Sequence, residues 1–454
     1  MKRVMFIIMA ACIAFGVYAA PVELKVPIPR DTPENKYRID AKMDQIKRFE
    51  AANPGITCVA VNFEYDNTGQ FLVMQAARQA PDVMSVWATE AQMLVAKKWI
   101  VSLDDYIKTW DRTAWYNKDA FLPFVVGGTR YGVPDQNYIK HVIYNKKMFA
   151  AKGVPAPKLN WTWADFTNAM VKCTDKAQGI AGFAPMGKGA ESGWGFTDFI
   201  YMAGGEVEQV RNGKAYAVFD SPEAIAAAQF FKDLKWKYDA IPANWANGWG
   251  DVYNVFGSLQ AAMVLDADNG RAIAINSLKM DPANIGLALM PKGPGAKGRQ
   301  AGVLGGTFLV TNGLAKSKEV RDAAWKWIVF ERWDDAGLAD LQAQIEDARA
   351  NKQFRAQFQY SPLLPTAPYV QKERAILVEN PDAAVAWGDA AFLSALPATA
   401  HIEPPVAAQD VYGKYLNNVV QVLFSEKNAD PAAIMKDANK RFQAEVLDPL
   451  NAAR

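Results

Sequence analysis

Two periods of hydrophobicity alternate along the first part of the chain. Residues 24–28, 56–63 and 83–87 are short runs rich in apolar and β-branched side chains, as expected of strands. Residues 40–52 and 70–78 instead place their apolar side chains on one helical face. Strands and helices that alternate in this way predict an α/β layer built on a mostly parallel sheet.

A second unit of the same kind follows. Residues 142–144 read as a strand, and Thr162 with Asp165 forms a capping-box sequence that predicts the start of a helix. Ser221 followed by Pro222 is typical of another helix start. A chain of 454 residues is too long for one core, so we expect at least two domains.

Residues 81–149 carry the most specific pattern. A short strand ends at Trp87, a small amphipathic helix and a turn at residues 103–105 follow, and a Gly-Val-Pro crossing at 132–134 leads to an apolar strand that closes on 144–146. This order resembles the extracellular solute-binding proteins of ABC importers for sugars, the maltose-binding-protein type. The likeness covers most of the chain.

The resemblance implies an α/β fold of the type II periplasmic-binding-protein kind, in which two discontinuous lobes are joined by a hinge and enclose a ligand cleft. Residues 22–136 plus 292–340 would form one lobe, and residues 137–291 plus 341–454 the other. It further implies a monomer that captures a mono- or oligosaccharide by lobe closure and delivers it to the membrane permease subunits of an ABC transporter. The resemblance implies neither catalysis nor a cofactor.

The N-terminal residues predict export. Lys2 and Arg3 precede an apolar run, residues 4–17, that is too short to span a bilayer comfortably, and small residues favour cleavage after Ala19. A lipoprotein anchor at Cys12 is the alternative. We therefore expect a signal peptide at residues 1–19 and a periplasmic or extracytoplasmic location.

Charge and rare residues argue against several functional classes. Without residues 1–19 the formal charge falls from +2 to zero, and no basic stripe suggests nucleic acid as a partner. His141 and His401 are the only histidines and lack metal-ligand spacing, so no metal site is expected. Cys58 and Cys173 fall in different units, which favours two free thiols over a disulfide.

Aromatic residues supply the first candidates for a binding site. An aromatic plane matches the apolar C–H face of a sugar ring, and the chain has 14 Trp and 16 Tyr residues. The resemblance suggests five cleft aromatics: Trp87 at a strand end, Trp194 between glycines ahead of a helix, Trp245 and Trp249 in one loop, and Tyr412. Packing into the core of a lobe is the alternative for these rings.

Polar candidates lie in loops and at strand ends, where carboxylates and amides can bind sugar hydroxyls. They are Arg30, Asp31, Glu90, Asp135, Gln136, Asn137, Asp266 and Asp268, together with Gly305, Gly306 and Thr307, where glycine lets a ligand approach the backbone. Helix-start, hinge-turn or solvated-loop roles are the alternatives for the polar side chains. Asp268-Asn269 stands where the family usually has an aromatic residue, which suggests a more polar ligand.

Two other functions remain open on the sequence. The same fold could bind a non-sugar solute, such as a phosphorylated polyol, a polyamine or a peptide, although few basic residues fall in the candidate loops. A secreted carbohydrate-active enzyme is the other possibility, because carboxylates are plentiful. The sequence lacks the glycine-rich loops of nucleotide-binding proteins and the Gly-x-Ser-x-Gly motif of serine hydrolases.

Overall fold

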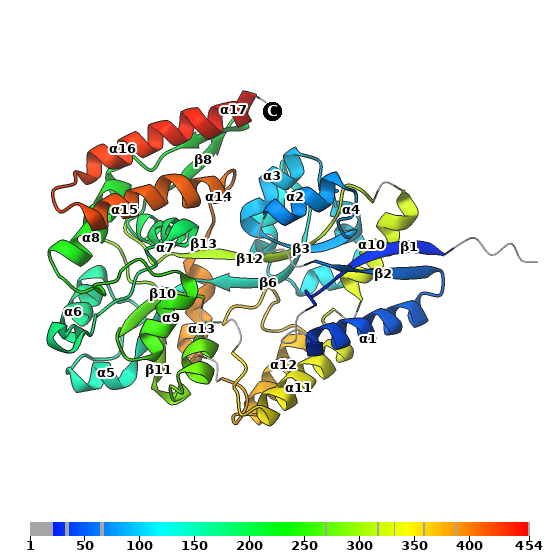
Figure 1. Cartoon of the computed structure of the whole chain (residues 1–454), viewed down its shortest axis with the longest axis horizontal. Coiled ribbons are helices and arrows are strands. Elements are labelled where there is room, and N and C mark those ends of the chain that lie inside the picture. Colours follow the sequence, from blue (N-terminus) through cyan, green and yellow to red (C-terminus); the bar gives the residue numbers. More distant parts are fainter. Residues whose placement is uncertain are drawn as a thin grey trace, which may run out of the picture.

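The computed structural model describes residues 21–31, 36–63, 68–267, 270–315, 317–330, 332–356, 359–385 and 388–452. Figure 1 shows two halves that lie side by side, with two long strands running across the middle between them. The predicted signal peptide at 1–19, with Cys12, lies outside the described residues, and so does Asp268.

The described strands range from two to ten residues in length. They are β1 (Val22–Ile28), β2 (Ile56–Asn62), β3 (Val83–Trp87), β4 (Val125–Val126), β5 (Thr129–Arg130), β6 (Val133–Ile139), β7 (His141–Asn145), β8 (Glu208–Arg211), β9 (Lys214–Ala217), β10 (Met263–Asp266), β11 (Ile285–Ala288), β12 (Gly302–Thr311) and β13 (Ala400–Ile402).

The helices cover the outer faces of both halves. They are α1 (Lys36–Ala52), α2 (Thr68–Ala76), α3 (Ala91–Ala96), α4 (Asp104–Thr109), α5 (Lys146–Ala151), α6 (Trp163–Cys173), α7 (Gly189–Met202), α8 (Pro222–Trp236), α9 (Trp249–Gly257), α10 (Lys318–Val329), α11 (Asp335–Ala350), α12 (Pro368–Glu379), α13 (Ala390–Ala395), α14 (Ala408–Asp410), α15 (Asn417–Ser425), α16 (Pro431–Phe442) and α17 (Asp448–Ala452). Within the described ranges, no helix combines the length and the apolar character needed to cross a membrane.

Strand β12 joins the two halves. It pairs antiparallel with β6 on one side, and on the other side with β13 in parallel and with β3 antiparallel. In the second half, β7 lies between β10 and β11 and is antiparallel to both. Of the strands from which a mostly parallel sheet was predicted, β1 and β2 do pair in parallel, whereas β3 pairs antiparallel with β12, so the prediction is confirmed only for the first pair. Strand β12 returns from the other half instead of following a crossover helix, so it meets β3 in the opposite direction.

Several local predictions are confirmed. Thr162 and Asp165 form the capping box of α6, in which the Asp165 carboxylate accepts from the Thr162 backbone N–H at 2.8 Å. The Ser221 side chain caps α8, with Pro222 in its first turn. Both predicted free thiols are free.

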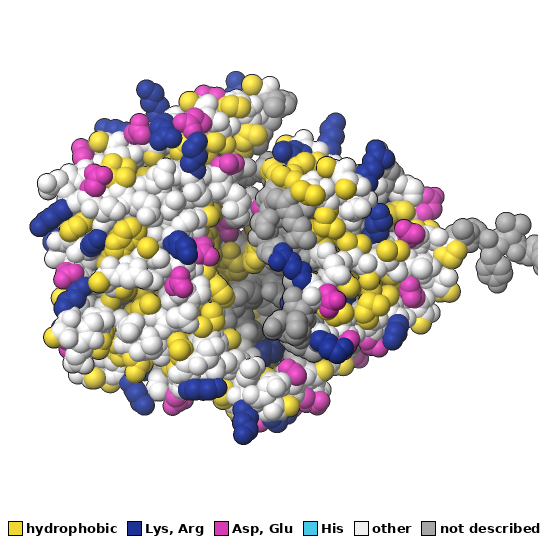
Figure 2. Space-filling model, in the orientation of Figure 1, with side chains coloured by type: hydrophobic (Ala, Val, Ile, Leu, Met, Phe, Trp, Pro, Cys, Tyr) yellow, Lys and Arg dark blue, Asp and Glu magenta, His cyan; other side chains and the backbone are white. Residues whose placement is uncertain are grey.

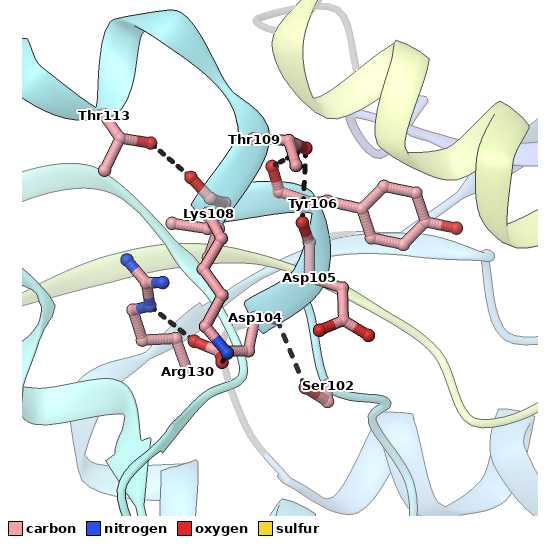
Figure 3. Close-up of polar contacts among 9 residues, drawn as sticks. Ser102, Asp104, Asp105, Tyr106, Lys108, Thr109, Thr113 and Arg130 are labelled. Carbon is pink, nitrogen blue, oxygen red and sulfur yellow. Dashed lines mark hydrogen bonds and ion pairs between the residues drawn. The ribbon is translucent and has the colours of Figure 1, made fainter.

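The turn predicted at residues 103–105 is instead the start of helix α4. Figure 3 shows why it forms: the Asp104 carboxylate lies between Lys108, one helical turn ahead, and Arg130. Lys108 Nζ is 2.5 Å from Asp104 Oδ2, and Arg130 Nε donates to Oδ1 at 2.7 Å. The carboxylate also suits the positive end of the helix.

The hydrophobic cores group segments that are distant in the sequence. Leu24 and Val26 of β1 share a core with Leu338 at the start of α11 and with Tyr369 and Val370 of α12. Figure 1 likewise draws α11 and α12 near α1. Because these helices contact the first half, the lobe boundary that we expected at residue 340 does not match the change of core, and the exact boundaries stay a prediction.

Candidate functional site

Three adjacent strands place Trp87, Thr307 and Gln136 in one row. In the register of the sheet, Thr307 of β12 lies opposite Trp87 of β3 and also opposite Gln136 of β6. The Trp87 side chain is 41% exposed, Gln136 is exposed and Thr307 is half-buried. An indole that is this open on a structured strand is available to a ligand.

The segment after Trp87 reaches the other half of the molecule. Glu90 is buried in a short 3₁₀-helix, η2 (Ala88–Glu90). The neighbouring Thr89 accepts a hydrogen bond at 2.7 Å from Gln409 Nε2 of α14. The row that begins at Trp87 therefore lies at the junction between the halves.

Asp135 takes part in a network within the first half. It forms an ion pair with Arg332 and accepts from Ser85 Oγ at 3.3 Å. These contacts agree with a structural role beside the β6 crossing. A ligand contact of Asp135 stays a prediction.

Asn137 and the two glycines of β12 are packed against each other. Asn137 is fully buried, and its Nδ2 donates to the Gly305 carbonyl at 3.3 Å, whereas Oδ1 has no partner among the described residues. A Cβ at Gly305 would collide with Tyr138 and Glu403, and Gly306 has a φ of 142°. Glycine is thus required here by the protein's own side chains and backbone.

Trp194 lies within α7, although the sequence suggested a position ahead of the helix. Its ring is half-buried and receives the ammonium group of Lys140 at 3.6 Å from the ring centroid. The ring of Tyr138 meets it edge-on at 5.9 Å. Trp194 is therefore one wall of a polar and aromatic cluster.

Trp249 and Asp266 form a second part of this site. Trp249 Nε1 and the Tyr253 hydroxyl both donate to Asp266 Oδ2, at 2.7 and 2.6 Å. The Trp249 backbone N–H donates to Glu191 Oε2 at 2.5 Å, which fixes the start of α9. Asp266 is fully buried, so the solvated-loop alternative does not hold for it.

The remaining candidates divide between core and surface. Trp245 packs edge-on against Phe424 at 5.3 Å, which favours the core alternative. Tyr412 is 2% exposed within the π-helix η9 (Val411–Leu416), and burial, followed by the charge of Glu403, raises the pKa of its hydroxyl. Arg30 and Asp31 are exposed after β1, and their role stays a prediction.

Sequence reasoning missed a buried ion pair at the centre of the site. Lys140 Nζ lies 2.6 Å from Asp198 Oδ2, and both side chains are fully buried. The Val303 backbone N–H donates to Asp198 Oδ1 at 3.0 Å. A signal was present, because each charge stands alone in an apolar run: Tyr-Ile-Lys-His-Val-Ile and Phe-Thr-Asp-Phe-Ile.

Glu403 was missed as well. The Tyr138 hydroxyl donates to Glu403 Oε1 at 3.3 Å. Burial raises the pKa of Glu403 to about 8, although the hydrogen bond from Tyr138 and the charge of Lys140 act in the opposite direction. Burial likewise raises the pKa of Asp266. Glu403 follows the short strand β13, and nothing in its local sequence marked it.

The site combines aromatic rings, buried carboxyl groups and amides at a junction of two halves. Comparison with protein families gives it a context: residues 35–330 match the model for bacterial extracellular solute-binding proteins. The chain belongs to this family. The family consists of binding proteins and not enzymes, in agreement with the expectation from the sequence.

Relatives of known sequence agree. A binding protein of Brucella abortus (strain 2308) is 27% identical over 88% of this chain and 88% of its own length. A protein of Escherichia coli (strain K12) named as an ABC transporter periplasmic-binding protein, YcjN, is 24% identical over 65% of each chain. The chain is thus a solute-binding component of an ABC transporter, which implies membrane permease partners.

Solved structures show the same fold. A solute-binding protein of Thermotoga lettingae bound to α-D-tagatose has a TM-score of 0.68 at 20% identity, over 93% of this chain and 99% of its own. Maltose-bound MalE3 of T. maritima has a TM-score of 0.67 at 21% identity, over 94% and 100%. UgpB of Mycobacterium tuberculosis in complex with glycerophosphocholine has a TM-score of 0.68 at 20% identity, over 95% and 99%. The two-lobed periplasmic-binding-protein fold expected from the sequence is confirmed.

Proposed function

We propose that this binding protein captures a carbohydrate between its two lobes and presents it to the permease. The observation that carries the proposal is the exposed indole of Trp87 beside Thr307 and Gln136. Along β12, Thr307 lies two residues from Gly305, where an added Cβ would meet the buried side chains of Tyr138 and Glu403. Figure 2 shows a furrow between the halves, with hydrophobic side chains on the wall formed by the half at the left.

The chemistry of these groups suits a sugar. The flat ring of Trp87 can stack on the C–H face of a pyranose, and amide and carboxyl oxygens can accept from its hydroxyls. Closure of the lobes would bury the ligand and favour the closed state, because more contacts form there than in the open state.

The ligands of similar proteins support a carbohydrate or polyol. Tagatose and maltose are bound in the structures described above, and a similar protein of Agrobacterium vitis was solved with D-mannitol. Glycerophosphocholine in the mycobacterial protein supports the alternative, a phosphorylated polyol. A phosphate would need convergent cations, and Lys140 is already paired with Asp198.

Export by residues 1–19 to the periplasm belongs to the same proposal. The family is extracellular or periplasmic, in agreement with an N-terminal signal. Mass spectrometry of the secreted protein tests it. A mature N-terminus at Ala20 supports the proposal, and a lipidated Cys12 contradicts it.

A thermal-shift screen tests the ligand class. Mono-, di- and oligosaccharides, polyols and sugar phosphates are added to the mature protein. A ligand at 100 times its Kd adds about 2.7 kcal/mol to the free energy of unfolding, so a genuine ligand raises Tm clearly. In Trp87→Ala we expect the shift from a sugar ligand to shrink, because the stacking surface is lost.

Tyr216→Ala is the matched control, since Tyr216 is an aromatic of similar exposure (37%) on the β8–β9 hairpin. This variant should keep the full shift. No response to any sugar or polyol, together with a clear shift from a sugar phosphate, would overturn the carbohydrate proposal.

A further inference from the structure

A cluster of charged side chains is buried where β6, β12 and the segment after β13 meet. The cluster is composed of Lys140, Asp198, Asp266 and Glu403, and none of these side chains is more than 5% exposed. Three carboxyl groups therefore accompany one ammonium group. Such an excess of carboxyl groups is costly in the interior unless a cation or hydrogen-bond donors compensate it.

The ammonium group of the cluster is already committed. Lys140 lies 2.6 Å from Asp198 and sits over the ring of Trp194. Asp266 receives hydrogen bonds from Trp249 and Tyr253. Glu403 receives hydrogen bonds from Tyr138 and Trp194 and is stabilised by the charge of Lys140, yet burial still raises its pKa to about 8.

One carboxyl oxygen of Glu403 has no hydrogen-bond partner in the described parts of the chain. Oε1 accepts from Tyr138, but Oε2 has no hydrogen-bond partner there, and the side chain is 5% exposed. Asn137 Oδ1 and Asp266 Oδ1 are further buried acceptors without a hydrogen-bond partner in the described residues. Asn137 Oδ1 is an acceptor only, and so is Glu403 Oε2 when the carboxyl group is ionised, so each suits a donor and not an anion.

There is space next to Glu403. It borders a cavity of about 240 Å³ that Tyr201, Glu206, Glu208, His401 and Arg211 also line. The Arg211 guanidinium is held by the Gln209 side chain. The other carboxylates of this cavity are satisfied. Glu206 is bound by Arg299 at 2.7 Å and His401 at 3.1 Å, and Glu208 accepts from the Val406 amide at 2.7 Å.

We propose that the solute of this protein carries a protonated amine, as an amino sugar does, and that its ammonium group pairs with Glu403. The inference rests on the proposed carbohydrate function and specifies its ligand. A carboxylate bordered by aromatic rings is the environment that favours an ammonium group, and Lys140 between Asp198 and Trp194 is an example within this protein. An acidic or phosphorylated sugar would place its charge beside these buried carboxyl groups, where Lys140 is already paired with Asp198.

Proton release provides an independent readout. With a pKa of about 8, Glu403 is mostly protonated at pH 7 in the free protein. An ammonium group favours the ionised form, so binding should expel a proton from Glu403. The titratable and charged groups around Glu403 are Tyr138 of β6, Lys140, Asp198 and Tyr201 of α7, Asp266 of β10, Tyr412 of η9, and Glu206, Glu208, Arg211 and His401 at the cavity.

Isothermal titration calorimetry of the mature protein tests the proposal. Glucosamine, glucose and glucuronic acid are compared at pH 7 in two buffers of different ionisation enthalpy, and so are the corresponding disaccharides: the glucosamine dimer, cellobiose and cellobiouronic acid. We expect the amine to bind about tenfold or more tighter than its neutral analogue, with proton release, and the acid to bind weakest.

Glu403→Gln should remove both the preference for the amine over its neutral analogue and the proton release. Glu208→Gln is the matched control, because it alters a buried carboxylate of the same cavity whose oxygens already accept from backbone amides. It should keep both effects, and circular dichroism verifies that the two variants fold.

Failure of the amine inference can be distinguished from failure of the carbohydrate proposal. A neutral sugar that binds as tightly as its amine, or an amine preference that survives in Glu403→Gln, would overturn this inference and leave the carbohydrate function intact. No binding of any of the six saccharides, followed by a negative screen of further sugars and polyols, would overturn both.

Discussion

One buried ion pair, Lys140 with Asp198, links the stability of the protein to its candidate site. Replacing Lys140 with Met leaves Asp198 without a counter-charge in a fully buried position. We expect this variant to lose about 3–5 kcal/mol in free energy of unfolding, measured by urea titration at pH 7. The loss in free energy of unfolding is large because the variant leaves the Asp198 carboxylate buried without a counter-charge, in addition to removing its attraction to Lys140.

Two further variants sharpen this test. Lys152→Met removes an ion pair with Asp175 that is partly exposed, so it should cost no more than about 1 kcal/mol. The double variant Lys140→Met/Asp198→Leu should recover most of the stability lost in the single variant. A single variant at Lys140 that is as stable as Lys152→Met would contradict the assigned burial.

Individual residues differed in how well the sequence predicted them. Trp87 stands at a strand end with an open ring, as expected, because strand ends follow from local hydrophobicity. Trp245 and Trp249 are neighbours in sequence but make different contacts, one with Phe424 and the other with Asp266. Which way a ring points depends on tertiary neighbours, and these are not encoded in the local pattern.

Helix α4 offers a test of pH dependence. Hydrogen bonding to Lys108, and then to Arg130, lowers the pKa of Asp104 below its usual value of about 3.9. A lowered pKa means that the carboxylate stabilises the folded state above pH 3.9 and that this contribution is lost as the pH falls through the folded-state pKa. Asp104→Asn should therefore lose up to about 1 kcal/mol at pH 7 and nothing in strong acid.

The control for this variant is Asp105→Asn. The Asp105 carboxylate points away from Lys108 and Arg130 in Figure 3. Urea titrations at several pH values should show little difference between Asp105→Asn and the native protein. A loss for Asp104→Asn that persists unchanged in strong acid would exclude the ion pairs as its cause.

Helix starts were predictable, whereas the direction of β12 beside β3 was not. The caps at Thr162 and Ser221 depend on residues within one turn, so the sequence contains all that is needed. The antiparallel pairing of β3 with β12 depends on where a chain returns after more than 200 residues, which no local pattern specifies. The packing of α11 and α12 with β1 was missed for the same reason.

For the molecule as a whole, the resemblance at residues 81–149 predicted the family and the two-lobed fold correctly. It did so because the order of strand, helix, crossing and strand follows from the path of the chain between the lobes, and that path is preserved at about 20% identity. The buried cluster was not predictable in this way. Its members come from four distant segments, and only the fold brings them together.

A hydrogen bond between the lobes, outside the proposed ligand contacts, should affect the affinity for the ligand. Gln409 of α14 donates to Thr89 of η2, so the bond joins the two halves in this conformation. Its loss in Gln409→Ala should disfavour the closed state by about 0.5–1.5 kcal/mol, since that is the net value of a typical hydrogen bond. Ligand affinity should fall by a factor of about 2 to 12, because a smaller fraction of the protein is competent to bind.

Calorimetry with a ligand from the screen measures this loss, and small-angle X-ray scattering of the free protein measures the accompanying shift towards an open shape. Gln229→Ala is the control, because Gln229 donates to Asp233 within helix α8 and contacts only its own lobe through that bond. Equal affinities for Gln409→Ala and Gln229→Ala would show that the Thr89–Gln409 bond does not contribute to closure. Weaker binding confined to Gln409→Ala, with an unchanged melting temperature of the free protein, would identify closure itself as the step that this bond favours.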